Sequence, residues 1–402
     1  MTYYTHLGQI PPKRHTQFRQ PNGTLYHEEL IGNQGFSGSH SLLYHLRPPT
    51  ELEQVTVIGS TQLAHEDAGA LRPRHFRTAE RGTGEDANYQ VSADAIASRI
   101  PLLTNTDLTL AIAQPNEPMT YWYRFAHGDE LLFIHQGRGQ LETQLGELHY
   151  GPGDYLIIPA GVLWRLIPDV DVAQTHLILE VTGHLHPPSQ YLSPQGKFLE
   201  QAPYCERDIR PPERLLTHDE VGIFEVRVKA RGRLTQYLYS HHPLDIVGWD
   251  GNLWPYAFNI EDFEPITGRI HQPPSVHQTF AGPNFVVCSF VPRLFDYHPQ
   301  GIPAPYNHAN VDSDEVIYYV EGQFMSRKGI EPGSITFHPS GLPHGPHPGT
   351  YAASIGQSHT EELAVMIDTF RPLQVTTQAR AMEDVDYVHS WRPSQHKEPM
   401  SQ

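Results

Sequence analysis

Residues 305–322 read PYNHANVDSDEVIYYVEG, and residues 332–349 read PGSITFHPSGLPHGPHPG. His308 and Glu315 precede a strand-like run in the first segment, and six residues separate that glutamate from the next glycine. The second segment is a strand-like run followed by the turn SGLP and then His344. Facing strands of a small β-barrel bring such side chains to one point. The spacing therefore predicts a metal site made of His308, Glu315 and His344.

The residue types of this predicted site indicate which metal it suits. Two neutral imidazoles and one carboxylate form the facial triad typical of non-haem Fe(II), which leaves positions open for a substrate oxygen and O₂. Asp314 is a competing carboxylate. Successive strand residues point to opposite faces, so Asp314 and Glu315 cannot both reach the ion. The spacing to the following glycine favours Glu315, and Asp314 stays the alternative.

An internal repeat supports the barrel independently of any single motif. Residues 127–137, HGDELLFIHQG, and residues 151–166, GPGDYLIIPAGVLWRL, repeat the pattern of the two segments above. In this repeat Glu130 occupies the glutamate position, but Trp164 stands where the second half has His344. The two halves are therefore expected to share one fold and to differ in their metal site.

This double pattern resembles the cupin family in its bicupin form. The resemblance predicts an all-β fold of two cupin jelly-roll barrels with an extended N-terminal arm. Many cupins have a third metal-binding His where this chain has Asn310, which favours a metal with open positions over one ligated fully by protein. In the first barrel His127, Asp129 and Glu130 have no His opposite them. We expect Trp164 to fill that barrel as core, without a catalytic metal.

Composition indicates the compartment and excludes some partners. Among 402 residues there are 36 Pro and 32 Gly between short β-rich runs, which is typical of strands and turns. The two cysteines, Cys205 and Cys288, follow no metal or disulfide spacing. No signal-peptide core and no run of about 18 apolar residues occurs. We therefore expect a cytoplasmic protein, and the net charge of −17 argues against nucleic acid or membrane partners.

The chain divides by composition into five expected segments. They are an N-terminal arm (1–40), a first barrel with a degenerate metal site (41–185), a Pro-rich linker (186–222), a second barrel with the iron site (223–375) and a polar tail (376–402). Residues 81–100 have little apolar periodicity and are predicted to be loop with one short helical turn.

The second half also resembles a more specific family, the homogentisate 1,2-dioxygenases. The segments that carry this resemblance, in unbroken order, are PLDIVGWDGNLWPYAFNIEDF (243–263), IHQPPS (270–275), FVVCSFVPR (285–293), APYNH (304–308) and TFHPSGLPHGP (336–346). The N-terminal segments LYHEELIGNQGF (25–36) and SLLYHLRPPT (41–50) are similar to that family too. The likeness thus spans nearly the whole chain.

The resemblance implies an oxidoreductase of tyrosine and phenylalanine breakdown that opens the ring of homogentisate, 2,5-dihydroxyphenylacetate, with O₂ to give maleylacetoacetate. By position, the Fe(II) ligands fall on His308, Glu315 and His344. The family's pocket histidine that interacts with the substrate hydroxyl falls on His271, and a second pocket histidine falls on His338. The family likeness also suggests a homo-oligomer whose ligands are O₂ and a small aromatic acid.

Two departures from the family pattern affect the site. The spacing from His308 to Glu315 is one residue longer than in the animal enzymes, which again leaves Asp314 as an alternative ligand. A pocket tyrosine of the family falls near Phe324 in this chain. The ring substituents of the substrate therefore stay open. In length and sequence type the chain resembles the shorter bacterial members.

Several further side chains are candidates for contact with the substrate. A phenol of pKa about 10 needs help to ionise near neutral pH, and His271 is the candidate base, although a loop histidine without such a role is the alternative. We expect His338, Tyr306 and His344 to contact the substrate; Tyr306 also suits core packing. The remaining candidates are Arg293 and Arg327, either as partners of a substrate carboxylate or as surface residues, and His347, at the pocket rim or in solvent.

Three functions are compatible with these patterns. The first is homogentisate dioxygenase, which incorporates both atoms of O₂. The second is a cupin dioxygenase with the same triad that acts on another hydroxylated aromatic acid, such as gentisate. The third is a non-redox bicupin, either an isomerase that uses Zn or Mn or a binding protein. The retained His, Glu and His weigh against a storage protein, and Asn310 weighs against a four-ligand isomerase site.

Overall fold

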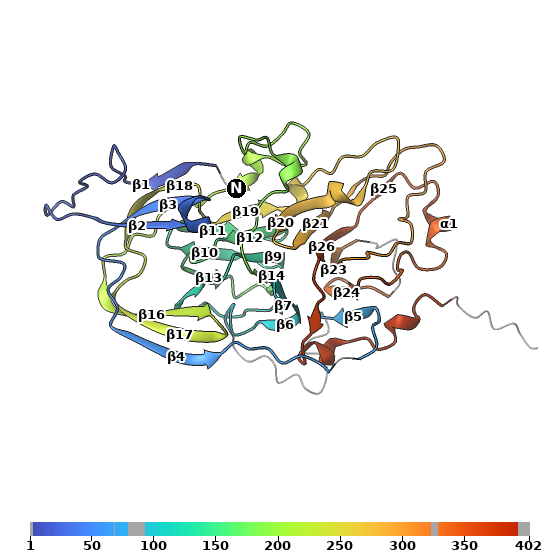
Figure 1. Ribbon diagram of the computed structural model, residues 1–402, viewed down its shortest axis with the longest axis horizontal. Helices are drawn as coiled ribbons and strands as arrows, with labels where there is room; N and C mark the ends of the chain where they lie inside the picture. Colours follow the sequence, from blue (N-terminus) through green and yellow to red (C-terminus); the bar gives the residue numbers. More distant parts are fainter. Residues whose placement is uncertain (1–2, 68, 79–92, 323–328, 393–402) are drawn as a thin grey trace, which may run out of the picture.

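Strands account for nearly all of the regular secondary structure (Figure 1). The computed structural model describes residues 3–67, 69–78, 93–322 and 329–392. These residues include one short α-helix, α1 (Thr350–Ser354). The 3-10 turns are η1 (Gln34–Phe36), η3 (Ser189–Tyr191), η4 (Glu206–Asp208), η5 (Ile260–Asp262), η6 (Pro274–His277), η7 (Ala379–Met382) and η8 (Tyr387–His389). The predicted all-β class is confirmed. Within the described part of the chain, no helix is long and apolar enough to cross a membrane.

Two large sheets form the first barrel. The eight-stranded sheet has the order β15 (Ile209–Arg210), β19 (Tyr256–Asn259), β12 (Asp154–Ile158), β9 (Glu130–Gln136), β14 (Thr175–Val181), β7 (Leu108–Ala113), β6 (Ile100–Thr104) and β27 (Gln374–Val375). The seven-stranded sheet has the order β11 (Gly146–Tyr150), β10 (Gly139–Thr143), β13 (Trp164–Pro168), β8 (Trp122–Phe125), β16 (Val221–Ala230), β17 (Arg233–His241) and β4 (Gln54–Ser60).

A smaller pair of sheets builds the second barrel, at the right of Figure 1. The six-stranded sheet has the order β20 (Gln278–Gly282), β21 (Phe285–Phe290), β26 (Leu363–Thr369), β23 (Asp314–Glu321), β24 (Ser334–His338) and β5 (Arg74–Arg77). The two-stranded sheet joins β22 (Arg293–Leu294) to β25 (His359–Thr360). Strand β23 is hydrogen-bonded on both edges, to β24 and to β26, which holds its side chains firmly in place.

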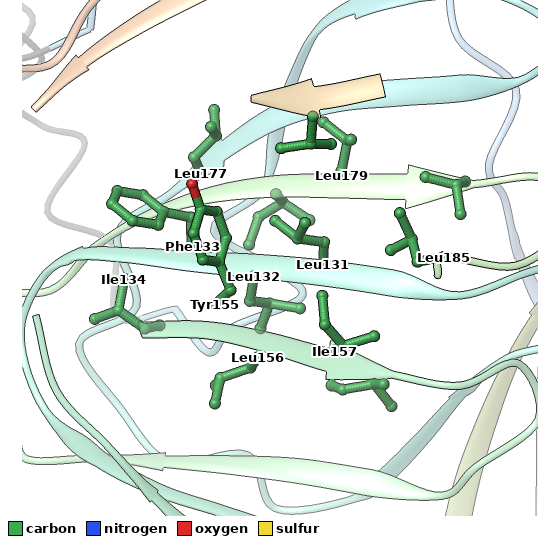
Figure 2. Packing of buried hydrophobic residues seen from close by; sticks show 14 of the residues in the cluster. Leu131, Leu132, Phe133, Ile134, Tyr155, Leu156, Ile157, Leu177, Leu179 and Leu185 are labelled. Carbon is green, nitrogen blue, oxygen red and sulfur yellow. The ribbon is translucent and has the colours of Figure 1, made fainter. Parts of the chain in front are cut away.

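The core runs without a break through both barrels. Strand β9 supplies four consecutive buried side chains, Leu131 to Ile134, which explains its unbroken apolar sequence. Figure 2 shows these residues packed against side chains of β12 and β14. Phe133 also contacts Tyr318 of β23, with ring centroids 6.4 Å apart, and the Tyr155 hydroxyl lies 2.9 Å from Ser289 Oγ on β21. The two barrels therefore share one hydrophobic interior.

The sheets do not follow the predicted segment boundaries. Strands β16 and β17 lie in the sheet of β8 and β4, so the predicted start of the second barrel at residue 223 is wrong by sheet membership. Strand β5, from the first half, pairs with β24 of the second barrel. A local alternation pattern identifies a strand but does not select its partner, because that choice depends on distant side chains.

The expected arm, linker and tail also differ from their predictions. A fifth sheet, of order β1 (Thr5–Gly8), β18 (Ile246–Gly251), β3 (His40–His45) and β2 (His27–Gly32), ties much of the predicted arm to the rest of the chain. The Pro-rich linker buries Tyr204 and contributes β15. The tail buries Tyr387. Residues 81–92 of the predicted loop and 393–402 of the tail lie outside the described residues.

Candidate metal centre

Three side chains predicted from the sequence converge at one end of the second barrel. Potential ligand atoms of His308, Glu315 and His344 all lie within 4.8 Å of one another, and the described residues contain no other such group. The Nε2 atoms of the two histidines each lie 3.4 Å from Glu315 Oε2. Backbone hydrogen bonds of 2.8 Å run in both directions between His308 and His344, so the two loops hold their imidazoles side by side.

The tautomers of the two imidazoles are set by backbone carbonyls. His344 Nδ1 donates to the Leu342 carbonyl at 3.0 Å, and His308 Nδ1 donates to the Tyr306 carbonyl at 3.2 Å. Each Nε2 lone pair is therefore directed toward the carboxylate. His344 Nε2 is buried without a hydrogen-bond partner among the described residues. Such an unpaired buried nitrogen, oriented by its other ring nitrogen, fits a metal ligand.

Glu315 keeps its negative charge although it is buried. Burial alone raises the pKa of this carboxyl, but the neighbouring imidazoles of His308, His338 and His344 outweigh that effect and hold the pKa well below its usual value. An ionised carboxylate between two imidazoles provides a binding site for a divalent cation.

Asp314, the alternative ligand, has a different task. Its Oδ1 accepts a hydrogen bond from the Ser340 backbone at 2.7 Å, and its Oδ2 accepts one from the Leu373 backbone at 2.7 Å. The carboxylate thus joins β23 to two neighbouring loops. Of the two adjacent acids, the structure brings Glu315 to the imidazoles.

His338 lies behind Glu315 and away from the cavity described next. Its Nδ1 is 3.0 Å from Glu315 Oε1, and its ring stacks on His344 with centroids 4.5 Å apart and an interplanar angle of 6°. The side chain is buried and is not among the described residues that line the cavity. This position does not support the predicted substrate contact. His344 is likewise buried, and its neighbour Gly345 reaches the cavity wall instead.

A cavity of about 700 Å³ opens beside the three converging side chains. Strands β21, β23 and β26 provide apolar wall residues, and the loops provide polar ones, among them Ile317, Phe290, Met366, Asn310, Tyr306 and His271. The volume is typical of a site for a small organic ligand. The cavity therefore places such a ligand next to His308 and Glu315.

Two predicted substrate residues lie on the cavity wall. The rings of His271 and Tyr306 are in edge-to-face contact, with centroids 5.3 Å apart, and Tyr306 in turn contacts His308. Asp296 Oδ2 lies 3.5 Å from His271 Nδ1. Tyr306 is 52% exposed, which excludes the alternative of core packing.

Other predicted residues are placed differently. Arg293 was expected either beside a substrate carboxylate or at the surface; only 16% of its side chain is exposed, and it pairs with Glu362 on the cavity wall at 3.2 Å. His347 was expected at the pocket rim or in solvent; it is buried, and its Nε2 lies 2.9 Å from Ser390 Oγ. Phe324 and Arg327 lie outside the described residues.

Asp368 and His277 were missed by the sequence analysis. Asp368 of β26 lies opposite Glu315 of β23 in the sheet. Burial and the nearby charge of Glu315 raise the pKa of Asp368 to about 7. Burial lowers the pKa of His277 to about 3. Asp368 Oδ1 and His277 Nδ1 are buried on the cavity wall without hydrogen-bond partners among the described residues. The acid within the apolar run AVMIDTF was the available signal for Asp368.

The equivalent position of the first barrel holds an arginine instead of a cluster of histidines. Glu130 accepts hydrogen bonds from Trp164 Nε1 at 2.9 Å and from Arg99 Nη1 at 2.8 Å. Arg99 Nη1 also bonds to Glu180 at 2.6 Å. Trp164 is fully buried, as expected. The guanidinium thus neutralises the buried carboxylates of this barrel.

The fold and the site together define a bicupin with a potential metal centre in its second barrel. A sequence profile described as "Homogentisate 1,2-dioxygenase N-terminal" matches residues 5–260, and one described as "Homogentisate 1,2-dioxygenase C-terminal" matches residues 259–398. The chain belongs to the homogentisate 1,2-dioxygenase family, as the sequence resemblance indicated. The two profiles meet after β19, which agrees with the pairing of β16 to β19 with strands of the first half.

Two sequence relatives support this assignment. The chain is 37% identical over 397 residues to a protein of Saccharolobus solfataricus named "Putative dioxygenase", an alignment that covers 98% of this chain and all of the relative. It is 27% identical over 436 residues to homogentisate 1,2-dioxygenase of Rhodopseudomonas palustris, covering 96% and 90% of the two chains. A solved cupin barrel protein from Leptotrichia buccalis covers 77% of this chain and 100% of its own, with 10% identity and a TM-score of 0.33.

Proposed function

We propose that this protein is an Fe(II)-dependent ring-cleaving dioxygenase that converts homogentisate and O₂ to maleylacetoacetate. The observation that carries the proposal is the unpaired, buried Nε2 of His344 facing Glu315 and His308 beside a ligand-sized cavity. Membership of the homogentisate 1,2-dioxygenase family supports the choice of reaction.

His308, Glu315 and His344 would hold the iron. Two imidazoles and one carboxylate match the donor set of non-haem Fe(II) sites, which keep open positions. When bound, Fe(II) supplies the redox chemistry that lets ground-state O₂ react with an aromatic ring. The protein supplies the ionised carboxylate and the two correctly oriented lone pairs.

His271 is the proposed acceptor of the phenolic proton. It lies on the cavity wall together with Tyr306, and the Asp296 carboxylate beside Nδ1 favours the tautomer that leaves Nε2 free to accept a proton. A phenol with a pKa of about 10 gains from such a base near neutral pH. The exposure of the ring on the cavity side is compatible with this role.

Arg293 is the proposed partner of the substrate carboxylate. It is the one arginine among the described cavity-lining residues, and it bonds to a single oxygen of Glu362. A guanidinium has five donors, so a substrate carboxylate can bind it alongside or in place of Glu362. The apolar walls formed by Ile317 and Phe290 suit the aromatic ring.

Oxygen uptake after anaerobic loading with Fe(II) tests this function. We expect uptake with homogentisate, with maleylacetoacetate as product, and much less with gentisate and other dihydroxybenzoates. His344→Ala should abolish it, and His359→Ala, an exposed histidine of β25, should not. Faster turnover of gentisate would replace the proposed substrate, and uptake by the His344→Ala enzyme would refute the site.

Compartment and assembly stay predictions. The expected cytoplasmic location and the expected homo-oligomer derive from the sequence and the family likeness. Sedimentation of the purified protein would show whether it is larger than the 45.5 kDa chain.

A further inference from the structure

The C-terminal segment lies against the rear of the metal centre. This segment, residues 384–392, includes η8 and contacts the loop that follows β24. The Trp391 indole donates to the Gly345 carbonyl at 3.0 Å, and the rings of Tyr387 and Trp391 are 5.2 Å apart. The Tyr387 hydroxyl lies 3.3 Å from His338 Nε2. A tail expected to be only polar therefore reaches the ligand network.

The hydrogen bonds from Tyr387 to Glu315 have a defined direction. A carboxylate that binds a metal only accepts hydrogen bonds, so His338 Nδ1 must donate to Glu315 Oε1. In the neutral ring Nε2 is then an acceptor, and the Tyr387 hydroxyl is positioned to donate to it. The tyrosine hydroxyl thus favours the His338 tautomer that carries its proton on Nδ1 and donates it to Glu315.

The two oxygens of the Glu315 carboxylate have different neighbours. His338 occupies Oε1, whereas Oε2 is the atom 3.4 Å from both His308 Nε2 and His344 Nε2. His338 also stacks flat on His344, which restrains the plane of that ring. One outer residue therefore contacts two of the three prospective ligands.

We propose that Tyr387, acting through His338, is a positioning residue that holds Oε1 of Glu315 and leaves Oε2 as the oxygen that would bind the metal. This inference rests on the proposed metal site. Its physical basis is that partners of ligand residues fix the orientation and basicity of those ligands, and their loss typically weakens metal binding about 10- to 100-fold.

A matched pair of variants separates positioning from packing. Tyr387→Phe removes the hydroxyl and keeps the ring, whereas Ser390→Ala removes the bond from the same segment to His347 and leaves His338 untouched. We expect Tyr387→Phe to weaken Fe(II) binding about 10-fold or more and to change the electron paramagnetic resonance spectrum of the ferrous–nitric oxide complex. Ser390→Ala should leave both unchanged. Equal effects of the two variants, or none from Tyr387→Phe, would overturn the inference.

A double-mutant cycle tests the path through His338. The amide of His338→Asn can donate to Glu315 Oε1 without help from the tyrosine, so Tyr387→Phe should have no further effect on Fe(II) affinity in that background. Additive effects would contradict the proposed path. If wild-type protein binds Fe(II) but does not turn over homogentisate, the proposed reaction fails and these affinities still decide the inference. If wild type binds no divalent metal, both fail.

Discussion

Adjacent acids on one strand do different work in this protein. Asp314 and Glu315 point to opposite sides of β23 because successive strand residues alternate. Asp314 accepts hydrogen bonds from two backbone N–H groups of neighbouring loops, whereas Glu315 accepts one from His338 and faces the Nε2 atoms of His308 and His344. The side on which each carboxylate lies, rather than its chemistry, decides its role.

This division can be tested with amide replacements. Glu315→Gln should lose its affinity for Fe(II), because a neutral amide replaces the charged ligand. Asp314→Asn should keep Fe(II) but lose about 1–3 kcal/mol of unfolding free energy, since an NH₂ group then faces a backbone donor. Metal content after anaerobic loading and denaturant unfolding measure the two effects. Full metal content in Glu315→Gln would show that Glu315 is not the carboxylate that binds the metal.

The proposed base is distinguishable from a ligand. His271→Asn should retain Fe(II) and lower the turnover of homogentisate by roughly 10²- to 10⁴-fold, the usual range for a lost acid or base. Oxygen uptake and iron content, measured on the same sample, separate the two possibilities. Unchanged turnover would make His271 a bystander, and lost iron would make it a ligand.

The structure brings together the candidate ligands that local spacing identified. His308, Glu315 and His344 follow from glycine and proline spacing around two strands, and the structure brings them together. Tyr387 was missed because its contact with His338 joins segments 49 positions apart, which no local pattern encodes. His338 was expected in the pocket from the family likeness, and the structure places it behind Glu315 instead.

Strands of the first barrel are held by a buried charge network where the second barrel has its site. Arg99, Glu130 and Glu180 each expose at most 8% of their side chains and join β9 to β14. Arg99→Met should cost about 3–5 kcal/mol of unfolding free energy, because two buried carboxylates lose their shared partner. Arg138→Ala, which breaks an exposed pair with Asp169, should cost at most about 1 kcal/mol. Denaturant unfolding compares them, and equal losses would contradict the network's role.

The N-terminal sheet contains a histidine that links its strands in a pH-dependent way. His45 on β3 lies 2.7 Å from Asp245 and 3.1 Å from Glu29 of β2. Burial alone lowers the pKa of His45, but these two carboxylates outweigh it and raise the pKa from 6.5 to about 9. The folded pKa is the higher one, so the stabilisation is complete below pH 6.5 and is lost as the pH rises through about 9.

Comparing wild type with His45→Gln between pH 6.5 and about 9.5 tests whether this stabilisation falls as the pH rises. The difference in unfolding free energy between wild type and His45→Gln should be largest below pH 6.5 and shrink by roughly 3 kcal/mol toward pH 9.5, from about 1.4 kcal/mol per pKa unit. A difference that grows with pH would mean that His45 is neutral in the folded protein.

The whole molecule should hold one catalytic metal per chain. The second half has the His-Glu-His group, and in the first half Arg99 and Trp164 already satisfy the equivalent glutamate. His344→Ala should reduce the metal content to background, and His127→Ala should leave it at one equivalent. Metal analysis decides this, and two equivalents in wild type would show a second site in the first barrel.

The overall architecture was predictable in kind but not in connectivity. The repeat of Glu130 and Glu315 within similar segments indicated two barrels, and the all-β class is confirmed. The sequence did not predict that β5 pairs with β24 or that β16 to β19 join strands of the first half. Pairing between strands more than 100 residues apart depends on side-chain packing, which the alternation of apolar and polar residues does not reveal. The contact between Phe133 and Tyr318, through which the two barrels share a core, was not predicted for the same reason.

The pairing of β5 with β24 bears on how this chain is made and how it can evolve. During synthesis Arg74–Arg77 leaves the ribosome long before Ser334–His338 exists, so this early strand must wait for its partner until β24 has been made. Recombination between genes meets the same constraint. A hybrid that takes its second barrel from one relative and its first from another inherits mismatched edges at β5, next to the strand that carries His338. The barrels of this protein are therefore expected to be inherited together.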